Sequence, residues 1–270
     1  MPRAIALPQL TAELRALGLR RDGVVMVHTR MSAIGWVIGG SETVVRALLE
    51  AIGPDGTLVA YASWQDHVYN AAEWPAEHRD AYVADPPVFD PATGEAARDH
   101  GRIPERVRTW PGARRSDHPE ASVVAVGAQA VELTADHPRD DAYGPASPFA
   151  RLVAAGGQVL MLGAPLETIT LLHHSEALAN VPNKRRVTST IPVREGGEIV
   201  PRTYTDNDTS GAVLPYGDLD LDADEFEVIA RAALHAGVGT TGRVGAADCY
   251  LFDARALVDF AVTWIEARFS

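Results

Sequence analysis

Residues 158–187 read QVLMLGAPLETITLLHHSEALANVPNKRRV, and this stretch decides the fold class. Its apolar run at 159–162 is typical of a buried strand, and the run ends at Gly163. Pro165 stands where a helix can open, and the pattern that follows predicts a helix over 168–179. A buried strand followed directly by a helix is the building unit of α/β proteins.

The predicted helix carries two histidines and a carboxylate. His173 and Glu176 are three residues apart and therefore share one helix face. Open α/β sheets build their sites just past the C-terminal ends of strands, where this helix begins. A carboxylate beside an imidazole fixes its tautomer and stabilises the imidazolium, which suits a general base. We interpret His173 and Glu176 as a catalytic pair.

Two alternatives for these residues stay open. A metal site is one, although HH-x-E lacks the i, i+4 histidine spacing of H-E-x-x-H and no third ligand is obvious. The other is a structural histidine pair hydrogen-bonded at a helix surface.

The N-terminal part of the chain predicts a parallel sheet. A helix is expected at 8–17, a strand at 24–28, a helix at 41–51 capped by Ser41, and a strand from 57 onward. The strand–helix–strand order is a βαβ unit, whose strands run parallel.

The remaining chain adds a broken, polar excursion at 65–100 with one short helix, and then further elements. These are predicted at 103–109 (helix), 122–127 (strand), 128–135 (helix), 188–193 and 199–206 (antiparallel strands), 225–235 (helix) and 249–269 (strand, then helix). We therefore expect one α/β domain over 1–270. Its central sheet is mixed, largely parallel and flanked by helices, with a strand-rich insertion at 188–224.

Composition restricts the class of protein. The 270 residues are 46% hydrophobic and 22% charged, as in a soluble enzyme, and no apolar run is long enough to span a membrane. We expect a cytoplasmic protein. The net charge of −12 argues against nucleic acid and fits a cationic partner. A lone Cys249 excludes an internal disulfide and a multi-cysteine metal cluster.

Several stretches together resemble the antibiotic N-acetyltransferase family, the aminoglycoside 3-N-acetyltransferases, and most resemble its gentamicin-type branch. The match runs in order along nearly the whole chain, so it is far more specific than one motif. The stretches are VHTRMSAIG (27–35), GPDGTLVAYASWQD (53–66), FDPATG (89–94), RTWPGARRSDHPEASVVAVG (108–127), YGPASPFARL (143–152), GQVLMLGAPLETITLLHHSEALA (157–179), FEVIARAALHAG (226–237) and GRVGAADCYLF (242–252).

The resemblance implies acetyl transfer from acetyl-CoA to the 3-amino group of the 2-deoxystreptamine ring of an aminoglycoside antibiotic. It also implies an α/β fold distinct from that of the GNAT acetyltransferases. His173 matches the family's catalytic histidine and Glu176 the acid that follows it, while His174 stands where relatives carry an apolar residue. The segment from His28 to Gly35 matches the region that contacts coenzyme A.

Two groups of residues are candidates for binding the two substrates. For coenzyme A they are His28, Thr29, Arg30, Met31, Ser32, Ala33 and Gly35, with Ser116 added from the donor-rich loop at 114–122. For the ammonium groups of the antibiotic they are Trp64, Asp66, Glu120, Asp206 and Asp208.

We expect His173 to take the amine proton and the acetyl group to pass directly, without an acyl-enzyme and without a metal. Three rivals stay open: another amine acceptor, a metal-dependent amide hydrolase using His173, His174 and Glu176, and a non-enzymatic protein that sequesters polycations. A homodimer, the preferred antibiotic and the role of Ser63 are also left open.

Overall fold

The computed structural model describes residues 4–66, 74–210 and 212–269. None of the helices within these ranges is long and apolar enough to cross a membrane.

A seven-stranded mixed sheet forms the centre of the molecule, in the order β3-β4-β2-β1-β5-β9-β8. The three central strands, β2, β1 and β5, pair in parallel, whereas β4 and β9 run the opposite way. The outer strands β3 and β8 are antiparallel to β4 and β9, and so point the same way as the centre. The strands are β1 (Val24–Thr29), β2 (Thr57–Tyr61), β3 (Arg114–Arg115), β4 (Val123–Gly127), β5 (Gln158–Leu162), β8 (Thr240–Val244) and β9 (Ala247–Asp253). The predicted mixed, largely parallel sheet is confirmed.

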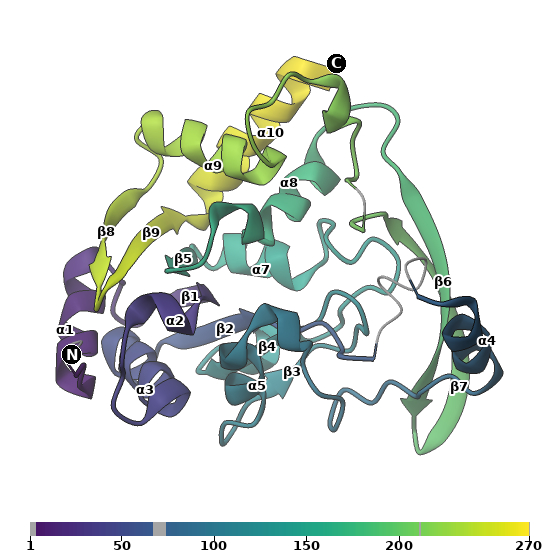
Figure 1. Ribbon diagram of the computed structural model, residues 1–270, viewed down its shortest axis with the longest axis horizontal. Helices are drawn as coiled ribbons and strands as arrows, with labels where there is room; N and C mark the ends of the chain where they lie inside the picture. The colour runs from purple at the N-terminus through teal and green to yellow at the C-terminus, as the bar shows by residue number, and fades with distance from the viewer. Residues whose placement is uncertain (1–3, 67–73, 211, 270) are drawn as a thin grey trace.

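Two apolar layers cover the sheet because successive side chains of a strand point to opposite faces. In β1, Val25 and Val27 belong to one buried cluster, and Val24 and Met26 to the other. The first cluster includes side chains of α1 (Leu7–Leu17), α2 (Met31–Ile34), α3 (Gly40–Ile52) and α5 (Arg102–Arg108). The second includes side chains of α6 (Ala130–Thr134), α7 (Pro148–Ala154), α8 (Leu171–Leu178), α9 (Glu225–His235) and α10 (Ala254–Phe269). Figure 1 shows the two groups of helices on either side of the sheet.

The strand-rich insertion is a long hairpin, β6 (Arg186–Glu195) and β7 (Glu198–Asn207), which forms its own antiparallel sheet. It lies at one side of the molecule, the side on which α4 (Ala76–Ala84) is also seen in the view of Figure 1. A small buried cluster of Trp64, Phe89, Ile191, Val193 and Tyr204 joins the hairpin to the chain that follows β2. The predicted antiparallel pair is confirmed.

Three local predictions are wrong. Ser41 does not cap its helix, because α3 already begins at Gly40 and the capping position is Gly39, in a left-handed conformation. The helix expected over 168–179 is divided into a 3₁₀ turn at Leu166–Thr168 and α8. The predicted order of elements, which places no helix between 135 and 158, is wrong because α7 lies there, its start marked by the Ser147 cap and Pro148.

Candidate active site

A cavity of about 980 Å³ lies at the edge of the sheet where the parallel strands β1, β2 and β5 end. Parallel strands bring their carboxyl ends to one edge, which is where open α/β sheets bind ligands. The lining residues are Val27, His28, Thr29, Arg30, Met31, Ser32, Tyr61, Ser63, Trp64, Gln65, Trp74, Ala97, Arg98, Asp99, His100, Gly101, Arg102, Pro104, Tyr143, Ala164, Pro165, Glu167, Thr168, Thr170, His173 and Phe226.

The α8 wall of this cavity carries the predicted pair. His173 lines the cavity, and its Nδ1 lies 2.7 Å from Oε2 of Glu176, whose side chain is only 1% exposed. The hydroxyl of Tyr216 donates to the other carboxylate oxygen, Oε1, at 3.0 Å. The rings of Tyr143 and Phe226 lie 5.0 and 4.7 Å from the imidazole. With Nδ1 held by the carboxylate, Nε2 is the nitrogen through which His173 can exchange a proton with a ligand.

The neighbouring His174 has a different environment. It is 2% exposed, and its Nδ1 lies 2.6 Å from the backbone oxygen of Tyr143. Burial lowers the pKa of His174, which favours the neutral form. The two histidines therefore do not form one site. Within the described ranges, no three His, Cys, Asp or Glu side chains gather as a metal-ligand set.

The predicted coenzyme A segment reaches the cavity with five of its seven residues. His28, Thr29, Arg30, Met31 and Ser32 line it. Ala33 lines an adjoining depression of about 390 Å³ that shares Arg30 with the cavity. Gly35 lines neither and ends α2 with a φ of 102°.

Ser116 is not brought to the cavity. Its side chain is fully buried, accepts the backbone N–H of Val123 at 2.9 Å and lies 2.9 Å from Nδ1 of His137. The donor-rich loop at 114–122 therefore adds the edge strand β3 to the sheet. Its Ser116 does not face the cavity.

The predicted antibiotic-binding residues are dispersed. Trp64 lines the cavity, whereas Asp66 is exposed and lies outside its lining. Glu120 and Asp206 are 6% and 1% exposed and lie outside the lining as well. Burial, together with the neighbouring Asp206, raises the pKa of Glu120 to about 7. Asp208 accepts from Arg185 at 2.6 Å. The structure brings only Trp64 of the five to the cavity.

Asp206 instead organises a cavity residue. Its Oδ2 accepts the backbone N–H of Ala142, next to Tyr143, and burial raises the pKa of Asp206 to about 6. This carboxylate therefore holds the segment whose Tyr143 ring packs against His173.

Sequence patterns give no role to several residues that line the cavity, or to Tyr216, which lies outside its lining and contacts Glu176. Tyr216 is 40 positions from Glu176, and Tyr143 and Phe226 come from other segments, so no local spacing signals them. Arg98 and Arg102 add two cations beside Arg30. Ser63 lies 2.5 Å from Nε2 of His100, which is 37 positions away.

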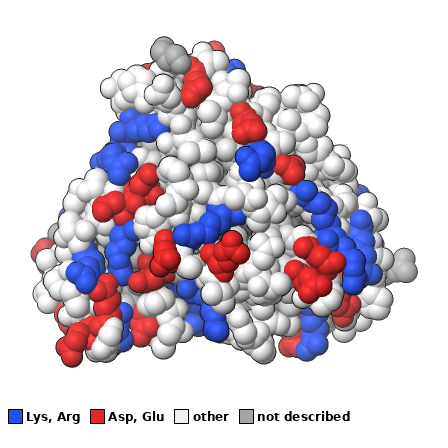
Figure 2. Space-filling model, turned by 180° about the vertical axis from the view of Figure 1, so that it is seen from behind, with Lys and Arg blue, Asp and Glu red and all other residues white. Residues whose placement is uncertain are grey.

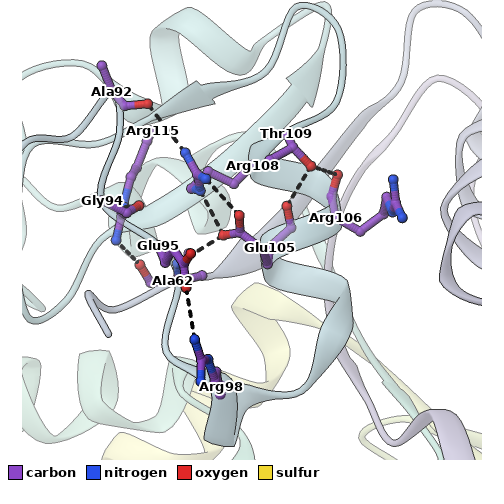
Figure 3. A network of polar contacts seen from close by, with 11 residues as sticks. Ala62, Ala92, Gly94, Glu95, Arg98, Glu105, Arg106, Arg108, Thr109 and Arg115 are labelled. Carbon is purple, nitrogen blue, oxygen red and sulfur yellow. Dashed lines mark hydrogen bonds and ion pairs between the residues drawn. The ribbon is translucent and has the colours of Figure 1, made fainter. Parts of the chain in front are cut away.

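A polar network builds the wall that carries Ser63 and His100 (Figure 3). Arg115 donates to the backbone oxygens of Ala62 and Gly94 at 2.6 and 2.5 Å. Glu105 accepts the backbone N–H of Ala96 at 3.0 Å and pairs with Arg108 at 2.6 Å. The segment at 92–100 is thereby fixed against the end of β2.

A histidine–carboxylate pair in a strand-end cavity of a mixed α/β sheet is typical of an α/β enzyme. A family model described as aminoglycoside 3-N-acetyltransferase matches residues 26–266. The chain is 53% identical over 262 residues to aminoglycoside N(3)-acetyltransferase VIII of Streptomyces fradiae, covering 96% of this chain and 91% of that one.

Solved structures agree with this match. Aminoglycoside acetyltransferase AAC(3)-Xa superimposes with a TM-score of 0.94 at 47% identity, over 99% of this chain and 94% of its own. AAC-IIIb in a binary complex with CoASH superimposes with a TM-score of 0.90 at 42% identity, over 99% of this chain and 98% of its own. The chain belongs to the aminoglycoside 3-N-acetyltransferase family, and it is an acyltransferase.

Proposed function

We propose that this protein transfers the acetyl group of acetyl-CoA to the 3-amino group of the 2-deoxystreptamine ring of an aminoglycoside, with His173 as general base. The observation that carries the proposal is the 2.7 Å contact between Nδ1 of His173 and the buried Glu176, at the wall of the strand-end cavity.

The chemical task of His173 is to remove a proton from the attacking amine. An ammonium group has no lone pair, so only the free base attacks a thioester. Nδ1–H donates to Glu176, which leaves the lone pair of Nε2 as the proton acceptor. Proton transfer by a positioned side chain contributes roughly 10²–10⁴-fold to a rate.

Glu176 and Tyr216 hold the base in place. The carboxylate accepts from the imidazole through one oxygen and from the Tyr216 hydroxyl through the other, so both oxygens are fixed. A buried carboxylate stabilises the imidazolium that forms as the amine attacks. Glu176 is therefore a positioning and charge-stabilising residue.

The thioester of acetyl-CoA supplies the electrophilic carbonyl, and we assign its binding to the β1 side of the cavity. Arg30, Arg98 and Arg102 are exposed cations along the lining and suit the phosphate groups. Thr29 Oγ1 and His28 Nε2 are buried polar atoms with no hydrogen-bond partner in the part of the chain that the structure describes. A polar ligand atom that reaches these residues would relieve the cost of leaving them unpaired.

The cavity is also lined by aromatic and acidic groups. Trp64, Asp99 and Glu167 line it, and carboxylates attract the ammonium groups of a polycation. The net charge of −12 is not gathered on the face turned away in Figure 1, where acidic and basic side chains are interspersed (Figure 2). We assign antibiotic recognition to the cavity, whose lining includes Asp99 and Glu167.

The direct route needs no covalent intermediate, because holding the amine and the thioester together supplies much of the acceleration. Acetylation of a different amine acceptor is the second candidate, since the arrangement of His173 and Glu176 would serve any primary amine. A metal-dependent hydrolase using His174 is disfavoured by the bond between His174 and the Tyr143 backbone.

The experiment measures release of free coenzyme A thiol from acetyl-CoA with a panel of aminoglycosides. Steady turnover is expected with antibiotics that bear a free 3-amino group and none with one that lacks it. Turnover of both kinds would contradict the regiochemistry. Coenzyme A binding without turnover on any member would direct the search to another amine.

A further inference from the structure

A serine–histidine pair also lines the cavity, opposite the wall formed by α8. Ser63 follows β2 and His173 follows β5, and β1 lies between these two strands. Adjacent strands are about 4.8 Å apart, so β2 and β5 lie about 10 Å apart on either side of β1. A thioester carbonyl bound over β1 would have Ser63 on one side and His173 on the other.

The Ser63 hydroxyl is within hydrogen-bond reach of a base. Its Oγ lies 2.5 Å from Nε2 of His100. On the far side of the ring, Nδ1 of His100 lies 3.9 Å from a carboxylate oxygen of Asp99. This carboxylate favours the proton on Nδ1, so that Nε2 accepts from the serine hydroxyl. Nucleophile, base and orienting acid stand in the order that activates a serine.

The protonation state of His100 suits this role. Burial lowers the pKa of His100, and the nearby Asp99 only partly opposes this effect. A neutral imidazole is the form that accepts a proton from a hydroxyl. The ring is packed edge to face on Tyr61, with centroids 4.8 Å apart.

The pair is held by backbone contacts on both sides. The N–H of Ala97 donates to the backbone oxygen of Ser63 at 2.8 Å, and Trp64 forms an antiparallel bridge with Ala96. Arg115 binds Ala62, the residue before Ser63, and Gly94 at the start of the opposite segment (Figure 3). A fixed geometry of this kind is what a nucleophile–base pair requires.

We propose that Ser63, activated by His100, is a second acyl acceptor, and that the protein hydrolyses acetyl-CoA when no amine occupies the cavity. This inference rests on the proposed function only in that the thioester binds in this cavity. Transfer to the amine proceeds through His173 and does not pass through Ser63.

The step balances without a further reactant. Ser63 Oγ bonds to the carbonyl carbon while Nε2 of His100 takes the hydroxyl proton. The carbon–sulfur bond then breaks, and that proton passes to the departing sulfur to give acetyl-Ser63 and the free thiol. Water attacks the ester and loses one proton to His100. The proton returns to Ser63 Oγ as acetic acid leaves.

The test separates the two walls by crossed substitutions. Thiol release is measured with and without an aminoglycoside for wild type, Ser63→Ala, His100→Asn and His173→Ala. Without an amine, Ser63→Ala and His100→Asn are expected to lower release at least about tenfold, while His173→Ala loses transfer and retains release. Thr190→Val, which removes an exposed hydroxyl of β6 paired with Thr203 outside the cavity lining, is the matched control and should retain release.

A second readout keeps the test decisive if a variant folds poorly. Acid-quenched wild-type protein is analysed by intact mass and peptide mapping after incubation with acetyl-CoA, and an acetyl group on Ser63 is expected. Amine-free release at the buffer rate, or equal release by folded Ser63→Ala, would overturn the inference while transfer by wild type keeps the proposed function. Absence of both transfer and coenzyme A binding would instead defeat the proposed function.

Discussion

The two walls of the cavity present the same side chain in different surroundings. On the α8 wall, His173 is 2.7 Å from Glu176, which is 1% exposed and also accepts from Tyr216. On the opposite wall, His100 is 3.9 Å from Asp99, which is 80% exposed. A buried carboxylate at contact distance orients an imidazole, whereas an exposed one is screened by water and salt.

We infer that the two histidines serve different reactions. The buried orienting acid belongs to the wall whose histidine we propose as the acceptor of the amine proton. The exposed acid, Asp99, belongs to the opposite wall, where Ser63 lies 2.5 Å from His100. The following substitutions test this difference.

The largest effect is expected for His173→Ala. Removal of the proposed base should lower kcat for acetyl transfer by about 10²–10⁴-fold, because the group positioned to accept the amine proton is lost. Coenzyme A binding, measured by calorimetry, should change little. His78→Ala, an exposed histidine on α4, is the control. Loss of antibiotic binding with kcat preserved would show that His173 is not the base.

Glu176→Gln should have the next largest effect. The amide keeps the shape of the carboxylate but lacks the charge that stabilises the imidazolium, so kcat should fall roughly 10- to 100-fold. Tyr216→Phe removes one hydrogen bond to the same carboxylate and should cost about 1 kcal/mol, or about fivefold. The pH dependence of kcat for both variants checks the assignment. Equal losses in the two variants would contradict the special role of the charge.

The histidine–carboxylate pair was accessible from the sequence because helix periodicity alone places residues three apart on one face. The parallel centre of the sheet followed from the first βαβ unit in the same way. The contacts that complete the site were not accessible. Tyr216 reaches Glu176 across 40 positions, and Ser63 reaches His100 across 37, through a bridge that no local pattern encodes.

The acidic candidates show a different limit. Glu120 and Asp206 were expected at the antibiotic because carboxylates bind ammonium groups. They lie instead in the interior, where Asp206 accepts a backbone N–H and the Tyr204 hydroxyl lies 3.5 Å from Glu120. Residue type cannot separate a carboxylate that binds a ligand from one that supports the chain behind it. Only the packing of segments distant in the sequence does so.

The substitution Glu120→Gln tests, through the free energy of unfolding, whether Glu120 ionises as a buried carboxylate. The pKa of Glu120 is raised to about 7 in the folded protein from 4.5, so its contribution is present below pH 4.5 and is lost as pH rises through 7. The variant lacks this loss. Its stability relative to wild type should therefore rise by up to about 3 kcal/mol between pH 4.5 and pH 8.

Urea unfolding at pH 5 and pH 8 measures this change. Glu198→Gln, an exposed glutamate on β7, is the matched control and should follow wild type. Parallel pH profiles of wild type and Glu120→Gln would mean that Glu120 ionises normally, as a carboxylate facing a ligand would.

The smallest effect is expected at the cavity mouth. Glu167 is exposed and lines the cavity, whereas Asp66 is exposed outside its lining. Exposed ion pairs contribute about 0.2–1 kcal/mol, so Glu167→Gln should raise KM for the aminoglycoside about two- to fivefold at low salt, and Asp66→Asn less. Added salt should remove the difference, because screening acts on exposed charges first. A larger effect at Asp66 would move the antibiotic away from the strand ends, toward the side of the molecule that carries the β6–β7 hairpin.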